Sequence, residues 1–290
     1  MNKFKTLLKW WGGKYYLSSW IRSHAPEHKH RVYVCAGGLG EAWNWDSEGI
    51  SEVANDVFLY LTNFYKVMQS EPLFAEFRRR IEATPFSEVE WRNSDQAFQD
   101  LEVEGPGQPA DLLRNPSVDL AVHFFVWNRQ SLTGRMSAFT SITRRRSRSG
   151  MNAEASAWWG AVAMLEEFHH RLKRILIREL DFAELIRQED TPDTLFYVDP
   201  PYLVGEHRSS IGAYRHEFDR EDHIRLLASL ADVEGKVMLS GYPSELYDSV
   251  LLSDDRWRKV TISIDNKAQM ADTKCTKTET LWCNFPISKG

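Results

Sequence analysis

Asp199, Pro200, Pro201 and Tyr202 form the segment of this chain whose residue types are best suited to chemistry. They follow the apolar run 194–198, which is typical of a strand buried on both faces. Ligands of open α/β sheets bind outside the carboxyl ends of strands, which is where this segment lies. A surface proline turn would have the same composition, but the buried strand that leads into it favours a binding site.

The two prolines determine what the neighbouring acceptors can do. They fix φ and donate no hydrogen bonds, so the Asp199 carboxylate and the Pro200 carbonyl can both accept from one amino group. The exocyclic amine of adenine is a poor nucleophile because its lone pair is conjugated with the ring. Two acceptors would draw it toward a tetrahedral geometry for attack on a methyl sulfonium, with Tyr202 stacked on the base. The segment therefore predicts methyl transfer by positioning and electrostatic stabilisation.

A glycine-rich segment, residues 35–40, ends the apolar run 31–36 and precedes an expected helix. Glycines let the backbone turn tightly and approach a ligand, and the helix N-terminus would offer free N–H groups. Asp56 lies 18 residues past Gly38, after a second strand-like run, and could hold both hydroxyls of a ribose. A plain tight turn and a dinucleotide site are equally compatible with this pattern.

Residues 9–14, with the sequence KWWGGK, place lysines and tryptophans beside a glycine turn. They could contact the carboxylate and the aromatic part of a ligand. A turn that precedes a helix and packs its tryptophans would give the same pattern.

Strand-like runs occur at 31–36, 50–54, 175–180, 194–198, 236–240, 257–264 and 279–285. Helix-like segments alternate with many of them, at 13–23, 57–69, 220–232 and 244–252. This alternation predicts an α/β fold with a largely parallel sheet covered by helices. It breaks between about 58 and 174, where helical patterns at 71–83, 119–128 and 155–172 are separated by loop-like stretches at 104–116 and 133–152. We therefore expect a helical insertion after the second strand of the core.

The composition is that of an ordinary globular protein, with 42% hydrophobic and 27% charged residues. The longest apolar runs fall short of the roughly 18 residues that span a bilayer, and the N-terminus lacks the features of a signal peptide. Cys35, Cys275 and Cys283 form no CxxC pair, so we expect reduced thiols in a cytoplasmic protein. His169 and His170 would point about 100° apart on a helix, so we expect no metal site.

The distribution of charge is more informative than the net charge of −5. No acidic residue stands between Asp119 and Glu154, and this stretch contains Arg129, Arg135, Arg144, Arg145, Arg146 and Arg148. An all-basic segment in an acidic protein predicts one face for a polyanion. A solvated loop would have the same composition.

The order of these motifs resembles the Dam-like family of DNA adenine-N6 methyltransferases. The matching features are the KWxGGK-type start, the glycine-rich segment, the pair Asn55-Asp56, the insertion and the DPPY segment; residues 222–230 and 237–242 also resemble the family. The similarity extends over nearly the whole chain and is weak across 70–120. It implies a Rossmann-like seven-stranded catalytic core, residues 1–64 and 171–290, interrupted by a helical target-recognition domain, residues 65–170.

The resemblance also implies a cofactor, S-adenosylmethionine, which leaves as S-adenosylhomocysteine. Trp10 and Lys14 would contact it, Gly37 and Gly38 would let its methionine part lie against the backbone, and Asp56 would hold the ribose hydroxyls.

Further cofactor contacts are implied by the rest of the chain. Asp181 and Phe182 would flank the cofactor adenine, and Asp199 would lie between the cofactor and the target base. The sequence departs from the family at Cys35, which with Val34 replaces a Pro-Phe pair and takes the place of a cofactor-facing aromatic ring. Trp11 replaces a smaller residue or a proline.

The resemblance assigns duplex DNA to the insertion. Residues 125–129 and 133–135 resemble the family's recognition stretch, and the implied DNA-binding residues are Asn128, Arg129, Arg135, Arg144, Arg145, Arg146 and Arg148. Most arginine contacts to DNA go to phosphates, so none of these is assigned to a base. The target adenine would have to leave the duplex to reach Tyr202. We expect a monomer or weak dimer in a bacterial or phage-infected cell.

Three other functions stay open at this point. The substrate could be adenine in structured RNA, or the N4 amine of cytosine, although serine is commoner than Asp199 in cytosine enzymes. The chain could also be an inactive DNA-binding protein with a methyltransferase fold. The sequence does not reveal the recognition site, or whether the protein serves regulation, phage protection or restriction–modification.

Overall fold

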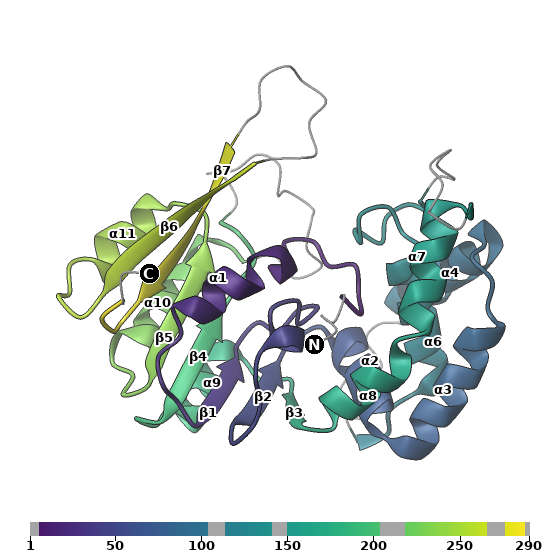
Figure 1. Ribbon diagram of the computed structural model, residues 1–290, viewed down its shortest axis with the longest axis horizontal. Helices are drawn as coiled ribbons and strands as arrows, with labels where there is room; N and C mark the ends of the chain where they lie inside the picture. Colours follow the sequence, from purple (N-terminus) through teal and green to yellow (C-terminus); the bar gives the residue numbers. More distant parts are fainter. Residues whose placement is uncertain (1–5, 104–113, 141–149, 204–217, 266–275, 288–290) are drawn as a thin grey trace. The chain divides into compact units, whose positions relative to one another are not determined.

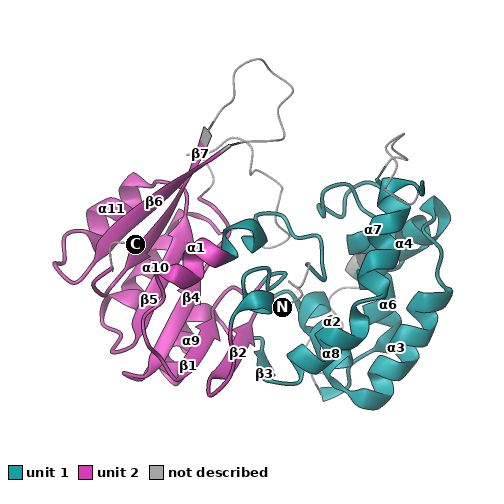
Figure 2. Cartoon of the chain, in the orientation of Figure 1, with its two compact units in different colours: residues 1–18, 37–45, 56–179 teal, residues 19–36, 46–55, 180–290 magenta. Residues whose placement is uncertain are grey.

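The computed structural model describes residues 6–103, 114–140, 150–203, 218–265 and 276–287. The chain divides into two compact units, which Figure 2 shows in different colours. The first comprises Met1–Ser18, Gly37–Trp45 and Asp56–Glu179, and the second comprises Ser19–Ala36, Asp46–Asn55 and Leu180–Gly290. Gly37 and Asp56 thus belong to the first unit, whereas the strands that precede them in the chain belong to the second.

Seven strands form one sheet in the order β3-β2-β1-β4-β5-β7-β6 (Figure 1). Each strand overlaps one of the seven apolar runs, so the predicted seven-stranded α/β core is confirmed. The strands are β1 (His30–Tyr33), β2 (Ser51–Asn55), β3 (Ile175–Arg178), β4 (Thr194–Val198), β5 (Lys236–Gly241), β6 (Arg258–Asp265) and β7 (Thr276–Cys283).

The sheet is mixed rather than purely parallel. Strand β1 pairs in parallel with β2 and β4, and β4 pairs in parallel with β5. Strand β7 is antiparallel to both β5 and β6. The order differs from the doubly wound order 3-2-1-4-5-6 only by the insertion of β7, and in such sheets ligands bind where the strand order reverses. The carboxyl ends of β1 and β4 lie at this switch point.

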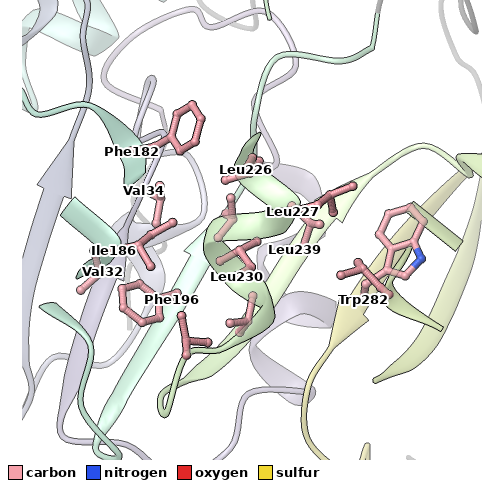
Figure 3. Close-up of a cluster of buried hydrophobic side chains, with 14 of the residues drawn as sticks. Val32, Val34, Phe182, Ile186, Phe196, Leu226, Leu227, Leu230, Leu239 and Trp282 are labelled. Atoms are coloured by element: carbon pink, nitrogen blue, oxygen red, sulfur yellow. The ribbon is translucent and has the colours of Figure 1, made fainter. Parts of the chain in front are cut away.

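The core of the second unit lies between one face of the sheet and three helices (Figure 3). These helices are α9 (Phe182–Glu189), α10 (Arg220–Ala231) and α11 (Glu245–Leu251); the short α1 (Ser18–Ser23) precedes β1. Alternate strand residues such as Val32, Phe196 and Leu239 meet Leu226 and Leu230 of α10, and all five are fully buried. Burial contributes roughly 1.5–3 kcal/mol for each such side chain, so the strand ends that lead into the candidate site are firmly held.

The first unit is built mainly of helices that pack around α6 (Val118–Arg129). Helices α2 (Leu59–Gln69), α3 (Glu71–Ala83) and α4 (Glu88–Val103) contact α6, α7 (Ala153–Val162) contacts α3, and α8 (Leu165–Leu172) contacts α2 (Figure 1). Nine of the 12 residues of α6 are buried. A helix that is apolar around its whole circumference is the centre of such a cluster.

Four local differences separate the structure from the expectations. The glycine-rich segment is followed by a three-residue 3-10 helix (Ala42–Asn44), so the expected helix N-terminus is wrong. The pattern at 155–172 forms two helices, α7 and α8. The segment 13–23 begins as a 3-10 helix (Tyr15–Leu17) before α1. Helices α4 and α9 were not expected.

Candidate functional site

The carboxyl ends of three neighbouring strands place part of the candidate site in the second unit. The Val34 N–H donates to the Tyr197 carbonyl at 3.0 Å, and the Ala36 N–H donates to the Asn55 carbonyl at 2.8 Å. These bonds extend the ladder beyond the ends of β1 and β2. The segment that leads to the glycines and the segment that leads to Asp199 therefore leave the sheet at adjacent positions.

Asn55 fixes the start of α9 relative to the sheet. Its side-chain amide donates to the Val34 carbonyl at 3.1 Å and to the Leu180 carbonyl at 3.0 Å, and its Oδ1 accepts from the Leu180 N–H at 2.7 Å. Asn55 is buried. The sequence singled out Asn55 only through the resemblance, and the structure assigns it to holding the backbone next to Asp181.

Asp181 and Phe182 are both contacted by Arg225, a residue that sequence reasoning missed. Asp181 caps α9 by accepting from the Ala183 N–H at 3.0 Å, and Arg225 Nη1 lies 2.7 Å and 2.9 Å from its two carboxylate oxygens. The Arg225 guanidinium lies 4.1 Å above the Phe182 ring. Phe182 is only 5% exposed and belongs to the core. The acid and the ring that were predicted to flank an adenine are thus held together by one cation.

Tyr202 stacks on Tyr242 in the second unit, with ring centroids 4.4 Å apart and an interplanar angle of 27°. Both rings line a small hollow of about 20 Å³, together with Pro200, Ser240 and Tyr247. The hollow therefore combines the DPPY segment with the end of β5. Sequence reasoning had noted residues 237–242 only as a resemblance and had not identified Tyr242 as an aromatic partner.

A buried histidine supports this hollow from behind. His223 on α10 lies with its Nδ1 2.7 Å from the Tyr247 hydroxyl, and its Nε2 has no hydrogen-bond partner among the described residues. Burial lowers the pKa of His223 from 6.5 to about 4, and Asp222 and Asp219 only partly oppose this shift. The imidazole is therefore neutral at physiological pH.

The glycine-rich turn of the first unit is organised by Asp56. The Gly37 N–H donates to Asp56 Oδ2 at 2.8 Å, and the Phe58 N–H donates to Asp56 Oδ1 at 2.9 Å. Gly37 has φ +47°, in the left-handed region that favours glycine. The carboxylate that was predicted to hold ribose hydroxyls thus ties the turn to the start of α2.

Trp10 packs directly on the two glycines. A Cβ added to Gly37 would lie 2.5 Å from Trp10 Nε1, and one added to Gly38 would lie 2.7 Å from Trp10 Cβ. A hollow of about 260 Å³ adjoins this contact and is lined by Trp10, Gly13, Gly38 and Gly40. The absence of side chains therefore creates both the seat for the indole and an adjacent cradle, which fits a small ligand held against backbone.

Tyr65 and Lys14 complete the surroundings of the turn. The Tyr65 hydroxyl donates to the Gly37 carbonyl at 2.6 Å, and burial, reinforced by Asp56 and Glu41, raises the pKa of Tyr65 well above its usual value. This hydroxyl therefore stays protonated and remains a donor. Lys14 is fully buried. Sequence reasoning identified Lys14 but missed Tyr65, which lies on α2 far along the chain.

The structure describes three of the predicted DNA-binding residues. Asn128 is fully buried, and Arg129 is 8% exposed and donates to the Ala157 carbonyl at 2.9 Å. Burial lowers the pKa of Arg129 to about 10. Arg135 is exposed, and its guanidinium lies 3.8 Å from the centre of the Trp11 ring. The remaining residues, Arg144, Arg145, Arg146 and Arg148, lie outside the described residues.

Other expectations concern cysteines, metals and membranes. Cys35 and Cys283 are free thiols, and Cys275 lies outside the described residues. Within the described ranges, His, Cys, Asp and Glu form no group of three or more that could hold a metal ion. No helix in the same part of the chain is long and apolar enough to cross a membrane.

Comparison with known proteins relates the chain to one family. Residues 10–270 match the family described as D12 class N6 adenine-specific DNA methyltransferase. Two proteins named DNA adenine methylase are also similar, from the classical Ogawa O395 and El Tor Inaba N16961 strains of Vibrio cholerae serotype O1. Each is 24% identical over 242 residues, which cover 81% of this chain and 78% of the relative.

Proposed function

Because the chain belongs to the D12 class of N6 adenine-specific DNA methyltransferases, we propose that Asp199, Pro200 and Tyr202 carry its reaction. That reaction is transfer of a methyl group to the exocyclic amine of adenine in DNA. The observation that carries the assignment is the place of this segment. It leaves β4 beside the end of β1, at the switch point of the sheet, and its tyrosine lines a hollow with a second aromatic ring.

Catalysis would depend on two acceptors aimed at one amine. The Asp199 carboxylate and the Pro200 carbonyl would accept the two amine hydrogens and free the nitrogen lone pair for attack. Pro201 stiffens the segment, so the acceptors would not need to reorganise during the reaction. The neighbouring sheet core holds the start of the segment.

Tyr202 would receive the target base by stacking. A base between Tyr202 and Tyr242 would need ring centroids about 7 Å apart, twice a contact distance of about 3.5 Å. The rings are 4.4 Å apart, so either they separate or the base stacks on the outer face of Tyr202. Both routes require the adenine to leave the duplex, as in other enzymes that modify a base.

We further propose that the methyl donor is S-adenosylmethionine, whose sulfonium would supply an electrophilic methyl group. Gly37 and Gly38 would leave room for its methionine part beside Trp10, and Asp56 would accept from its ribose hydroxyls. The cradle at Gly38 and Gly40, which a Cβ would narrow, supports this fit. Lys14 would contribute positive charge.

The residues for the other end of the cofactor come from the second unit. Asp181 and Phe182 would flank its adenine, with Arg225 holding the pair, and Cys35 would stand near it.

Duplex DNA would be recognised by the helical segment between β2 and β3, which corresponds to the predicted domain 65–170. The exposed Arg135 supports this assignment, because a guanidinium at the surface can reach a phosphate. The four arginines at 144–148 would add phosphate contacts.

The test is methyl transfer from labelled S-adenosylmethionine to unmethylated duplex DNA, with N6-methyladenine identified in the product. We expect Asp199→Ala to abolish transfer while circular dichroism and cofactor binding persist, and Asp255→Ala, an exposed acid outside the site, to keep activity. Full activity of Asp199→Ala would refute the mechanism. Transfer to RNA but not DNA would overturn the substrate, and cofactor-free DNA binding without transfer would indicate an inactive protein.

A further inference from the structure

Asn128, at the end of α6, holds the backbone of Lys9 from both sides. Its Oδ1 accepts from the Lys9 N–H at 2.9 Å, and its Nδ2 donates to the Lys9 carbonyl at 2.7 Å. Asn128 is fully buried. Its amide oxygen and nitrogen are thus both engaged with one residue of the N-terminal segment.

The side chain of Lys9 is held by the same group of helices. Lys9 Nζ lies 3.3 Å from Glu154 Oε2 on α7 and 3.2 Å from the Ser131 carbonyl. Burial lowers the pKa of Lys9, whereas Glu154 acts in the opposite direction. The loop after α6 also lies close to the Lys9 backbone, because a Cβ at Gly134 would overlap the Lys9 carbonyl oxygen. Lys9 therefore has little freedom to shift.

The residues that follow Lys9 link it to the glycine-rich turn. Trp10 packs on Gly37 and Gly38, whereas the next residue, Trp11, faces Arg135 of the loop after α6. The hollow beside Gly38 is lined by Lys9 and Trp10 and also by Thr133 of that loop. All of these residues belong to the first unit. Residues 9–11 thus connect the end of α6 to the cradle proposed for the cofactor.

We propose that Asn128 is a positioning residue for the cofactor site: by fixing the Lys9 backbone, it sets the place of Trp10 over the glycines. The inference rests on the proposed binding of S-adenosylmethionine at this turn. It gives Asn128 a different task from the DNA contact implied by the resemblance. A side chain that is fully buried and bonded through both amide groups is poorly placed to reach DNA.

The chain contains a matched control for Asn128. Asn63 on α2 is also fully buried in the first unit, and it makes the same pair of bonds to the backbone of Ser117, at 3.0 Å and 2.8 Å. Replacement of either asparagine by alanine deprives one residue's N–H and carbonyl of their side-chain partner. Both variants should lose similar stability, but only Asn128→Ala loosens Lys9.

A second perturbation tests the same link without removing a hydrogen bond. Gly134→Ala would push on the Lys9 carbonyl oxygen and would also adopt φ +76°. Gly150→Ala is its control, because Gly150 has φ +77° and an added Cβ meets nothing within 4 Å. Both variants place alanine in a left-handed backbone conformation, but only Gly134→Ala brings a Cβ against Lys9.

The experiment measures the dissociation constant of S-adenosylhomocysteine by calorimetry, the KM for S-adenosylmethionine, and DNA affinity. We expect Asn128→Ala and Gly134→Ala to weaken cofactor binding about tenfold, or about 1.4 kcal/mol. We expect less than a twofold change for Asn63→Ala and Gly150→Ala. The kcat at saturating cofactor and the affinity for DNA should stay near the wild-type values. A general loss of structure would lower both.

Two outcomes would overturn the inference. If Asn128→Ala binds the cofactor as Asn63→Ala does, and Gly134→Ala as Gly150→Ala does, Lys9 does not position Trp10. If Asn128→Ala weakens DNA binding but not cofactor binding, Asn128 serves DNA instead. Failure of the proposed function is distinguishable, because the wild-type protein itself would then bind no S-adenosylhomocysteine.

Discussion

The packing of Trp10 on the glycine turn gives a prediction whose size follows from the structure. Gly38→Ala would place a Cβ 2.7 Å from Trp10 Cβ, about 1 Å closer than an ordinary carbon contact. Relief of such overpacking costs about 1–3 kcal/mol. Gly37→Ala adds the cost of a left-handed backbone, about 1–2 kcal/mol, to a Cβ contact of 2.5 Å with Trp10 Nε1. We therefore expect the free energy of unfolding to fall by about 1–3 kcal/mol in Gly38→Ala and by about 2–5 kcal/mol in Gly37→Ala.

Gly49→Ala separates the two contributions. Gly49 has φ +70°, and an added Cβ meets nothing within 4 Å, so this variant carries the backbone cost alone. We expect it to lose about 1–2 kcal/mol and to bind S-adenosylhomocysteine normally. Gly38→Ala should lose a comparable amount of stability but bind about tenfold more weakly, because its Cβ displaces Trp10 from the cradle.

Urea denaturation and calorimetric titration of the three variants provide the assay. A double-mutant cycle with Trp10→Gly makes it specific, since removal of the whole side chain, including the Cβ that a Gly38 Cβ would approach, should restore most of the stability lost in Gly38→Ala. The reasoning is refuted if Gly38→Ala binds the cofactor as tightly as wild type, or if the two substitutions are additive in stability. Additivity would mean that the Cβ and the indole do not compete for the same space.

The other predictions concern single groups. His223 has a folded-state pKa of about 4 against 6.5 when unfolded, so the unfolded state binds more protons between these values and stability falls as pH drops through that window, by up to about 3 kcal/mol. Urea melts at pH 7 and pH 5 should show a smaller loss of unfolding free energy in His223→Asn than in the wild type, whereas His170→Asn, at an exposed site, should lose as much as the wild type. An equal loss in His223→Asn and the wild type would contradict the lowered pKa of His223. Iodoacetamide should label Cys35 more slowly when S-adenosylhomocysteine is present, as measured by peptide mass spectrometry. It should not label Cys283, because burial raises the pKa of that thiol to about 12. Labelling of Cys35 at the same rate with and without S-adenosylhomocysteine would mean that Cys35 does not belong to the cofactor site. Arg225→Ala should keep a melting temperature within a few degrees of the wild type, because the ion pair between Arg225 and Asp181 is half-exposed. The same variant should bind the cofactor more weakly. Unchanged cofactor binding would mean that this ion pair does not face the cofactor.

The sheet was predictable because its strands are almost continuously apolar. Run 194–198 became β4, with all five residues buried, as the prediction of a strand buried on both faces required. The antiparallel place of β7 between β5 and β6 was not predictable, since the apolar pattern of a strand does not reveal the direction of its neighbours. Strand pairing is decided by contacts that are distant in sequence.

The two missed helices failed for different reasons. Helix α4 is mostly polar, and among its residues Trp91, Ser94 and Phe98 are buried, which leaves a weak helical pattern. Helix α9 carries the clear spacing of Phe182, Leu185 and Ile186. That spacing predicts an amphipathic helix, and the first two residues of the segment, Asp181 and Phe182, also resemble a cofactor motif.

Asn128 and Arg129 stand at the end of a helix whose sequence pattern predicts burial. Their polarity and the resemblance predicted a DNA contact, yet residues 118–127 are apolar around nearly the whole helix, a pattern of a buried centre. The end of such a helix is enclosed with the rest of it. Position along a buried element was therefore the stronger signal, and it was available from the sequence.

The glycines illustrate a different case, in which the chemical interpretation and the structural one are compatible. The sequence explains Gly37 and Gly38 by close approach of a ligand, whereas the structure shows that Trp10, 27 residues earlier than Gly37, already occupies the space of their missing side chains. These explanations are compatible because the hollow is lined by Trp10, Gly38 and Gly40 together. The missing Cβ atoms of Gly37 and Gly38 seat the indole, and the hollow lies beside it. No spacing rule could have revealed this contact, since it depends on where Asn128 holds the preceding residue, Lys9.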